Sequence, residues 1–409
     1  MNKNGLHLLY FTAEPWPTFR PDLVALFNKY LPRYGISCDL VTARDLASTS
    51  NLESPWQAGE ALLCELPGNR AGQYLVQLWH NLRVLITMDA KKYDAIQVRD
   101  MSITALAALI AAKLRGIQFF YWLSYPQSEG QVDRAWARGI KGGMRFWFPL
   151  LQGIFGKWLL YRIVLPRADH VFVQSRRMQL DVAQQGIAMA KMTPVPMGVD
   201  TDVSNPETIQ PADDRRLEGK RVLVYLGTLD RVRRIEILLQ MLALIKPRIP
   251  NIMLALVGDS GDTAHWEWLK QEAETIGVAD HVLWTGWLPA RQAWSYVRSA
   301  EIGLSPFPRG FLLDSASPTK AVEYMALGLP VVANDNPDQA QVIEESGAGI
   351  CVTLEPGAFA ESVIRLLSDD GLRHKMANEG RQYIARTRTY DSLACTLAAT
   401  YRILQFRRQ

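Results

Sequence analysis

The sequence has few cysteines and no long apolar run. Its four cysteines, Cys38, Cys64, Cys351 and Cys395, are scattered among 409 residues, without a CxxC pair or metal-like spacing with the six histidines. This pattern argues against a disulfide framework and a zinc site, and it indicates a reducing compartment in which the cysteines are small core residues. The uncharged apolar runs, such as residues 146–156, are shorter than the ~18–20 residues of a spanning helix, so we expect no transmembrane segment.

Two nucleotide-binding motifs are also absent. The chain contains neither GxGxxG nor GxxxxGK[ST], which argues against a dinucleotide-dependent hydride enzyme and a P-loop kinase. The apolar run at residues 6–12 is too short for a signal peptide and predicts a first strand. With 48% apolar and 21% charged residues and a net charge of +4, the composition is that of a folded protein, and the length predicts two domains.

Short β-rich runs alternate with helical patterns along the whole chain. In the first half, strands are predicted at residues 6–11, 38–41, 95–98, 119–123 and 170–174, and in the second half at 221–228, 252–259, 281–286, 301–308 and 330–335. Such alternation indicates parallel sheets covered by helices on both faces.

The pattern pauses at residues 193–214, a stretch rich in Pro, Asp and Thr that we interpret as a linker. The predicted fold is therefore α/β, with two doubly wound Rossmann-like domains facing across a cleft. The expected domains are residues 1–197 and 198–388, and a final helix at 389–409 could cross back to the first domain. Ligands of such sheets bind where strands lead into helices.

One such loop, "GTLDRVRR", follows the strand that ends at Leu226. Gly227 allows a tight exit, and Arg231, Arg233 and Arg234 lie at the start of the next helix. Cations are unfavourable at a helix N-terminus, but a bound phosphate would make them favourable. The alternative is that these arginines are solvated on a surface turn.

A second loop begins a helix at "SPTKAVEYMALGLPVVAND", residues 317–335. Ser317 is predicted to cap this helix and Pro318 to occupy its first position. Thr319, Lys320 and Glu323 share one polar stripe, which suits a diphosphate at Lys320 and a ribose at Glu323. A merely local pair between Lys320 and Glu323 is an equal alternative.

Together these segments resemble the retaining GT-B glycosyltransferases of family 4, over nearly the whole chain. The resemblance is carried by "RVLVYLGTLDRVRRIEILLQML", "HVLWTGWLP", "SPFPRGFLLDSASPTKAVEYMALGLPVVAND", "ADHVFVQSRRMQLDVAQQGI" and "VPMGVD", in this order. It implies a donor that is a nucleotide-diphosphate sugar, UDP- or GDP-linked, without any other cofactor.

The resemblance also implies roles for single residues. Arg233, with Arg231 and Gly227 beside it, would hold the diphosphate together with Ser317 and the main-chain N–H groups of Thr319 and Lys320. Glu323 would bind the ribose, and the main chain around Trp287 would bind the base. No metal is implied, since fixed cations and helix N–H groups stabilise the leaving diphosphate.

The chain departs from the family's pattern at three places. Ser315, beside Asp314, stands where the family has its first signature glutamate, and Thr228 stands where an Arg is frequent. In the first domain, Ser124 takes the place of a histidine and "FTAEPWPT" that of a glycine-rich loop. Asp314 and Ser315 are therefore the candidate catalytic residues on the donor side.

Other groups of the first domain are expected to serve the acceptor. The candidates are Glu14, Arg99, Asp100, Tyr125 and Glu129, of which Glu14 and Asp100 are the predicted catalytic residues. The resemblance implies a front-faced reaction in which the leaving diphosphate can itself take the acceptor's proton.

Residues 134–167 form a basic segment without Asp or Glu. It contains Arg134, Arg138, Lys141, Arg145, Lys157, Arg162 and Arg167, interleaved with seven aromatic residues. This combination is typical of a segment lying in the interface of an anionic bilayer. Nucleic acid would also attract such charge, but no nucleic-acid motif accompanies it, and a half-buried helix pair with extended arginine side chains is the plainer alternative.

These features predict a retaining, metal-independent glycosyltransferase of bacterial polysaccharide assembly. Its expected partners are a nucleotide-sugar donor, a lipid-linked or saccharide acceptor and the membrane, without nucleic acid. Its expected location is the cytoplasm, at the inner face of the plasma membrane. The alternatives are an inactive sugar-nucleotide-binding subunit, a GT-B sugar-nucleotide epimerase and a nucleic-acid-binding protein.

Overall fold

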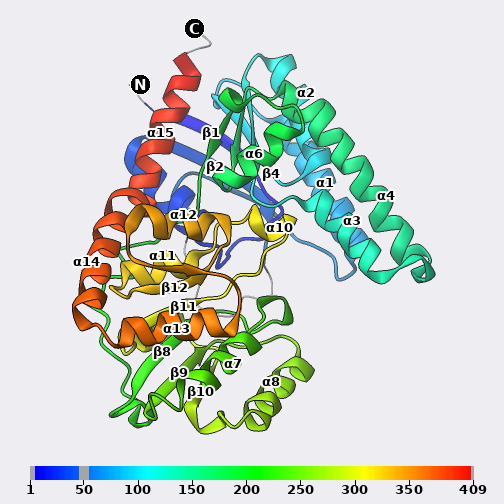
Figure 1. Ribbon diagram of the computed structural model, residues 1–409. Helices are drawn as coiled ribbons and strands as arrows, with labels where there is room; N and C mark the ends of the chain where they lie inside the picture. Colours follow the sequence, from blue (N-terminus) through cyan, green and yellow to red (C-terminus); the bar gives the residue numbers. More distant parts are fainter. Residues whose placement is uncertain (1–4, 46–54, 407–409) are drawn as a thin grey trace. The chain divides into compact units, whose positions relative to one another are not determined.

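The computed structural model describes residues 5–45 and 55–406, and these form two compact units (Figure 1). Unit 1 comprises Met1–Pro196 and Tyr390–Gln409, and unit 2 comprises Met197–Thr389.

Unit 1 is built on a parallel sheet of seven strands in the order β3-β2-β1-β4-β5-β6-β7. The strands are β1 (Leu6–Phe11), β2 (Ile36–Ala43), β3 (Ala61–Cys64), β4 (Ala95–Arg99), β5 (Gln118–Leu123), β6 (His170–Val173) and β7 (Met192–Pro194). The helices are η1 (Asp22–Tyr30), α1 (Arg70–Thr87), α2 (Ser102–Arg115), α3 (Gln127–Arg138), α4 (Met144–Leu159), α5 (Leu165–Arg167), α6 (Arg176–Gln184) and α15 (Tyr390–Phe406).

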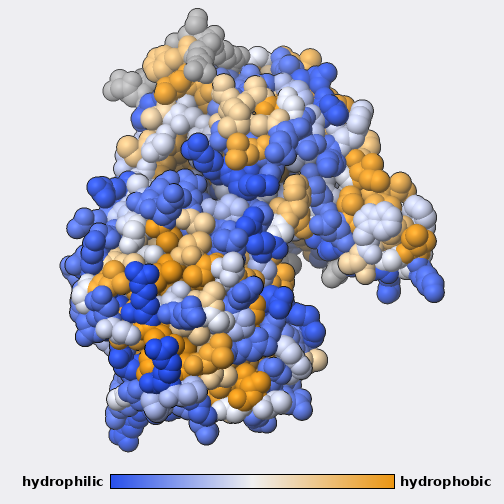
Figure 2. All heavy atoms as spheres, in the orientation of Figure 1, coloured by the Kyte–Doolittle hydropathy of each residue, from blue (hydrophilic) through white to orange (hydrophobic). Residues whose placement is uncertain are grey.

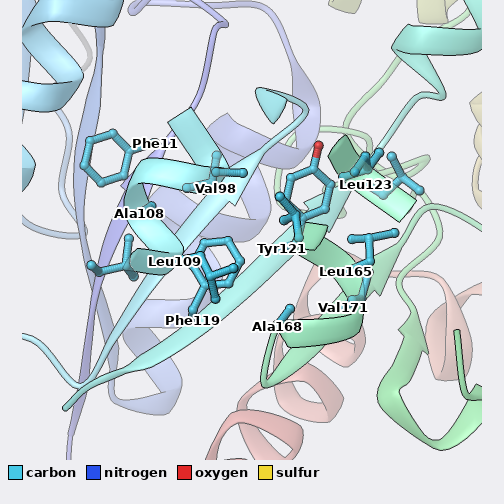
Figure 3. Close-up of a cluster of buried hydrophobic side chains, with 14 of the residues drawn as sticks. Phe11, Val98, Ala108, Leu109, Phe119, Tyr121, Leu123, Leu165, Ala168 and Val171 are labelled. Carbon is cyan, nitrogen blue, oxygen red and sulfur yellow. The ribbon is translucent and has the colours of Figure 1, made fainter. Parts of the chain in front are cut away.

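Both faces of this sheet are buried, because alternate residues of β1 enter two different cores. Leu9 and Phe11 belong to one core, which α2 and the residues around Leu165 complete (Figure 3). Leu8 and Tyr10 belong to the other core, where η1 and α15 pack. The apolar runs of β1, β4 and β5 are therefore the sequence of a sheet covered on both sides.

The final helix, α15, belongs to unit 1 although unit 2 precedes it in the chain. Its residues Tyr390, Leu397 and Tyr401 are buried in the second core. The Tyr401 hydroxyl donates a hydrogen bond of 2.6 Å to Oε1 of Gln97 on β4. The helix thus completes one face of the unit 1 sheet.

Unit 2 repeats the architecture with six parallel strands in the order β10-β9-β8-β11-β12-β13. They are β8 (Arg221–Leu226), β9 (Ile252–Val257), β10 (Val282–Gly286), β11 (Ile302–Ser305), β12 (Val331–Asn334) and β13 (Gly349–Val352). The helices are α7 (Glu236–Ile245), α8 (Thr263–Thr275), α9 (Ala290–Arg298), α10 (Phe311–Asp314), α11 (Thr319–Ala326), α12 (Pro337–Ser346), α13 (Pro356–Leu367) and α14 (Asp370–Thr387). Val222 and Val224 enter one core, and Leu223 and Tyr225 the other.

The predicted α/β class with two doubly wound Rossmann-like domains is confirmed, and some local predictions are wrong. The stretch at 193–214 that we interpret as a linker begins within the edge strand β7 (Met192–Pro194), which tolerates Pro194 because it pairs on one side only. The expectation that the cysteines are core residues holds for Cys38, while Cys351 and Cys395 are exposed. No helix within the described residues is both long and apolar enough to cross a bilayer.

Candidate functional site

The start of α11 in unit 2 presents backbone N–H groups that no side chain caps. The helix begins at Thr319, after the extended residue Pro318. The prediction that Ser317 caps the helix is wrong. The Ser317 hydroxyl instead donates to Oδ2 of Asp338 at 2.7 Å and accepts from the Met197 N–H at 3.0 Å. Asp338 is buried beside Arg388 and takes this hydroxyl as a second partner.

Tyr324, in the second half of α11, holds this helix against two strands of the sheet. Its hydroxyl accepts a hydrogen bond of 2.7 Å from the Leu226 N–H, at the end of β8. The same hydroxyl donates to the Leu304 carbonyl of β11 at 3.3 Å. The helix N-terminus therefore lies where the strands of unit 2 end, which is the ligand-binding edge of an open α/β sheet.

Lys320 extends from this helix across the end of β8. Its side chain lies so close to Gly227 that a Cβ on the glycine would come within 2.6 Å of the lysine Cε. The Lys320 Nζ is 5.3 Å from the centre of the Tyr225 ring. Burial, and next the positive charge of Arg233, lower the pKa of Lys320 to about 8.

Arg233 is a second cation that turns inward at the same place. Its guanidinium lies 4.7 Å from the centre of the Phe307 ring. Two of its nitrogens, Nε and Nη1, are buried without a hydrogen-bond partner in the described part of the chain. A buried charge without a partner is unfavourable, so this arrangement suits an anionic ligand.

The neighbouring arginines differ from Arg233. Arg231 is exposed, and Arg234 forms an ion pair with Glu236. The solvated-arginine alternative thus describes Arg231, whereas the inward orientation belongs to Arg233.

Glu323 lies about one turn beyond Lys320 and is half-buried. Within the residues that the structure describes, its carboxylate makes neither an ion pair nor a hydrogen bond, so no local pair with Lys320 forms. Trp287, which follows β10, is 68% exposed. Its indole packs little against the protein, which leaves the main chain of this loop as the fixed element.

Asp314 and Ser315 lie between β11 and α11, at the end of the short helix α10, and both are buried. Arg309 donates hydrogen bonds to both oxygens of the Asp314 carboxylate, from Nε to Oδ1 at 2.8 Å and from Nη2 to Oδ2 at 3.0 Å. The Ser315 hydroxyl donates to the Phe311 carbonyl at 3.3 Å. The Asp314 carboxylate is thus neutralised by Arg309 and fixes the shape of the loop.

The loop that carries Phe307 is anchored by a buried polar network. Asn334 accepts from the Phe307 N–H at 2.6 Å and donates to the Phe307 carbonyl at 2.9 Å. Gln339 bonds Asn334 and Ser305 in turn. This network keeps the ring under Arg233 in place, as second-layer contacts do in other binding sites.

A separate charged cluster lies at the strand ends of unit 1. Arg99 pairs with Asp22 at 2.7 Å and donates to the Ser124 hydroxyl at 3.1 Å. Ser124 donates in turn to the Asp100 carboxylate, through both its N–H and its hydroxyl. Burial raises the pKa of Asp100. Arg99 and Arg20 lower the pKa of Asp22, although burial, the largest influence, opposes them.

Of the two predicted acceptor-side carboxylates, only Asp100 belongs to this cluster. It has a positive φ of 53°, an unusual conformation for a residue other than glycine. Glu14 is half-buried and accepts a hydrogen bond of 2.9 Å from the Thr18 hydroxyl. A strained, buried carboxylate at the end of a strand is a typical feature of functional sites.

Sequence reasoning missed Tyr225, Phe307 and Tyr324 as parts of the unit 2 site. Aromatic residues in and beside strands normally indicate core, and no local pattern separates a ring under a cation from a ring in the core. Within the described ranges, no group of three or more His, Cys, Asp or Glu is placed to hold a metal ion.

Both halves of the chain match known families. Residues 207–383 match the family described as glycosyl transferases group 1, and residues 25–198 match the glycosyl transferase 4-like domain.

The chain is also similar to proteins of known name and structure. It is 27% identical over 215 residues to a GDP-mannose-dependent alpha-(1-6)-phosphatidylinositol monomannoside mannosyltransferase of Mycobacterium tuberculosis, covering 51% of this chain and 55% of that protein. The chain spans about half the length of the curated relatives it matches.

Two solved structures share its fold. HepE of Anabaena, in complex with UDP, superposes with a TM-score of 0.71 at 17% identity, covering 97% of this chain and 100% of that chain. WaaG, a glycosyltransferase involved in lipopolysaccharide biosynthesis, superposes with a TM-score of 0.64 at 14% identity, covering 96% of this chain and 99% of that chain. The fold of the chain is therefore GT-B.

Proposed function

Because the chain belongs to the glycosyl transferases group 1, we propose that it transfers a sugar from a nucleotide-diphosphate sugar to a hydroxyl of a lipid-linked saccharide. The observation that carries this proposal is the pair of inward cations, Arg233 and Lys320, at the uncapped start of α11. Two cations and a helix N-terminus together are complementary to a diphosphate.

The donor would lie along the strand ends of unit 2. Arg233, Lys320 and the N–H groups of Thr319 and Lys320 would bind the diphosphate. Glu323, whose carboxylate is without a partner among the described residues, would accept hydrogen bonds from the ribose hydroxyls. The main chain at Trp287 would contact the base. Either UDP or GDP fits, since HepE is named with UDP and the mycobacterial relative with GDP-mannose.

In the proposed reaction the bond between the anomeric carbon and the diphosphate oxygen breaks. A bond to the acceptor oxygen forms on the same face, so the configuration is retained. The acceptor's proton passes to the departing diphosphate, and Arg233 and Lys320 stabilise the charge that develops there. No step of this reaction calls for a metal ion.

The candidate catalytic residues divide by role. We propose that Asp314, held by Arg309, and Ser315 position the loop next to the sugar. Asp100 and Glu14 in unit 1 would serve the acceptor hydroxyl. Asp100 is the stronger of the two, because its burial and positive φ set it apart.

The acceptor is proposed to be held at the inner face of the cytoplasmic membrane, in polysaccharide assembly. Support comes from α4, whose outward residues Trp147, Leu151 and Phe155 are 49%, 62% and 54% exposed. Figure 2 displays hydrophobic atoms gathered along this helix, at the right of the view. Arg145 in the first turn of α4 and Arg138 and Lys141 before it are exposed and form no ion pair in the described ranges. Such a surface is complementary to anionic lipid.

The experiment that tests the donor site is a panel of UDP-, GDP- and ADP-sugars, read first as thermal stabilisation and then as release of nucleoside diphosphate. The preferred donor should raise the unfolding temperature by mass action, and its nucleotide should be released in the presence of acceptor. Binding without any release would favour the inactive subunit, and release of an epimerised sugar nucleotide would favour the epimerase. No stabilisation by any sugar nucleotide would contradict the proposal.

A further inference from the structure

Unit 1 contains a cavity that adjoins the charged cluster around Arg99 and shares Asp100 with it. Its volume is about 260 Å³, and its walls come from α1, α2, α3, α4 and the turn after β4. On α1 the lining residues Tyr74, Gln77, Leu78 and Asn81 recur at helical spacing, so one face of the helix forms one wall. On the opposite side, α4 packs closely on α3 because Gly153 and Gly156 have no side chain. A Cβ on Gly153 would lie 2.7 Å from the Ser128 carbonyl oxygen, and a Cβ on Gly156 would lie 2.7 Å from the Ser128 hydroxyl.

The lining of this cavity is rich in uncharged amides and hydroxyls. The amide side chains are Gln77, Asn81, Gln127, Gln131 and Gln152, and the hydroxyls are on Ser102, Thr104 and Ser128. Asp100 is the only charged residue among the lining residues, and none of them is a lysine or arginine. Amides and hydroxyls recognise neutral polyols through paired donors and acceptors, whereas a phosphate would require cations or free N–H groups.

Asn81 gives a second, independent indication of a ligand. Its side chain is 1% exposed, and its amide nitrogen donates to the Thr104 hydroxyl at 3.3 Å. Its Oδ1 is buried and has no hydrogen-bond partner in the part of the chain that the structure describes. A buried acceptor of this kind is unfavourable unless a donor reaches it, and a ligand hydroxyl is such a donor.

The rim of the cavity is apolar and exposed. Tyr74, Ile103 and Phe155 line the cavity and are 46%, 42% and 54% exposed. The same three helices expose further apolar residues beside the cavity. These are Leu75 and Trp79 on α1, Ile110 and Leu114 on α2, and Leu151 and Trp158 on α4. No Asp or Glu occurs in these three helices. A polar cavity bordered by exposed apolar residues of these three helices fits a ligand with a polar head and a lipid tail.

We propose that this cavity binds the uncharged saccharide head of a membrane-held acceptor, whose lipid chain leaves over Tyr74, Ile103 and Phe155. The inference rests on the proposed glycosyl transfer and adds to it where the saccharide head binds and that this head is uncharged. The volume is slightly below the roughly 300–1,000 Å³ of usual ligand pockets, which suits a single sugar ring. Any phosphate of the acceptor stays outside the cavity, because no lining residue is cationic.

The test uses the full chain and three octyl glycosides, the glucoside, galactoside and mannoside, each below its micelle concentration. Octyl phosphate is the charged comparison. Binding is measured by calorimetry and by saturation-transfer NMR. At least one glycoside should bind more tightly than octyl phosphate. If octyl phosphate binds as tightly as the best glycoside, or if no glycoside binds, the proposal is overturned.

The variants locate the binding. Asn81→Leu and Gln131→Ala should each weaken glycoside binding about three- to tenfold, the usual effect of a lost hydrogen bond. Gln184→Ala, an exposed glutamine on α6, is the matched control and should bind as the parent does. Gln131 is half-buried, so its variant keeps the test decisive if Asn81→Leu does not fold. Phe155→Ser should weaken the octyl glycoside but not the corresponding methyl glycoside. Unchanged binding in both cavity variants would refute the assignment.

Nucleotide binding is measured on the same proteins and separates the two proposals. The cavity variants should bind the preferred sugar nucleotide as the parent does, because their residues belong to unit 1 and the donor site to unit 2. If the parent chain binds glycosides but no sugar nucleotide, the donor proposal fails and the cavity assignment stands. If it binds the nucleotide but no glycoside, the cavity assignment fails alone.

Discussion

Lys320 combines two properties that conflict in the free protein. Burial and the neighbouring Arg233 lower its pKa to about 8, yet its place at the start of α11 suits a charged partner. A bound diphosphate would counteract both influences and raise the pKa again. The charge on Lys320 is therefore expected to cost stability in the free protein and to be useful in the complex, a balance that is common at binding sites.

This conflict predicts proton uptake on nucleotide binding. Near pH 9 most of the free protein has a neutral Lys320, so diphosphate binding takes up a proton, and affinity falls as the pH rises through about 8. At pH 6.5 the lysine is already protonated and contributes no uptake. Calorimetry in two buffers of different ionisation enthalpy measures the uptake. Equal uptake in the parent and in Lys320→Met at pH 9 would contradict the assignment.

The same conflict predicts a gain in stability when the charge is removed. A lysine whose folded pKa lies below its unfolded value costs stability below the folded pKa, and this cost disappears as the pH rises towards the unfolded value. Lys320→Met should therefore unfold at a higher temperature than the parent at pH 7, by a few degrees, while losing nucleotide affinity. The difference in unfolding temperature should shrink at pH 10.

Arg233 and Arg231 offer a matched comparison within one loop. Arg233→Ala removes the inward guanidinium over Phe307 and should weaken nucleoside diphosphate binding about ten- to a hundredfold, the range for hydrogen bonds to charged groups. Arg231→Ala removes an exposed arginine two residues away and should change affinity little. Titration calorimetry with UDP and GDP measures both. Similar losses in the two variants would indicate a general charge effect instead of a specific contact.

At the scale of elements, the end of β8 and the start of α11 are in close contact. Gly227 has a φ of 141°, and its missing Cβ makes room for the Lys320 side chain. Gly258 approaches even more closely, since its Cβ would come within 2.0 Å of the Gly227 carbonyl. The strand ends are thus packed backbone to backbone, and glycine is required at position 258 for this contact.

A double-mutant cycle tests whether Gly227 serves Lys320. Gly227→Ala should destabilise the protein through its backbone strain and through the contact of 2.6 Å with the lysine Cε. In the Lys320→Ala background only the backbone strain remains, so the second loss should be smaller. Urea unfolding of the four proteins measures the coupling. Equal losses in both backgrounds would show that the glycine acts on the backbone alone.

How far these elements could be predicted depends on burial. The central strands β1, β4, β5, β8 and β9 are apolar runs, and a run of that kind identifies a strand covered on both faces. The edge strands β3 and β13 are short and only partly buried, so their sequences carry little signal. Local sequence patterns therefore predict the α/β architecture but not the edge strands β3 and β13.

The site was predicted less completely than the fold, for a related reason. Lys320 and Arg233 could be singled out because cations at a helix start are unusual there. Ser317 was misread because a serine before a proline has the local pattern of a cap. Its actual partner, Asp338, lies 21 residues away, and so distant a competitor leaves no trace in the neighbouring sequence. The unit 1 cavity likewise could not be predicted, because its lining residues come from four helices and no single segment of the sequence contains them.

At the scale of the whole molecule, the charge is small but unevenly distributed. A net charge of +4 is spread over 409 residues, while residues 134–167 contain seven basic residues and no acidic one. In unit 1 this segment contains α4, which packs on α2, and α2 packs in turn on α1; all three helices expose apolar residues. If the chain binds a membrane as we propose, charge and apolar surface on one set of helices predict that unit 1 meets it on this side, which net charge alone would not predict.

We expect this surface to bind anionic membranes. The chain should sediment with vesicles that contain anionic lipid, and less with neutral vesicles or at high salt. Removing the charges of Arg138, Lys141 and Arg145 should weaken binding about a hundredfold, since each cation near such a surface contributes ~1 kcal/mol. A variant that loses Arg215, Lys220 and Arg248, three exposed cations of unit 2, has the same net charge and should bind as the parent does. Equal losses in the two triple variants would mean that binding depends on net charge, and the membrane surface would not lie on unit 1.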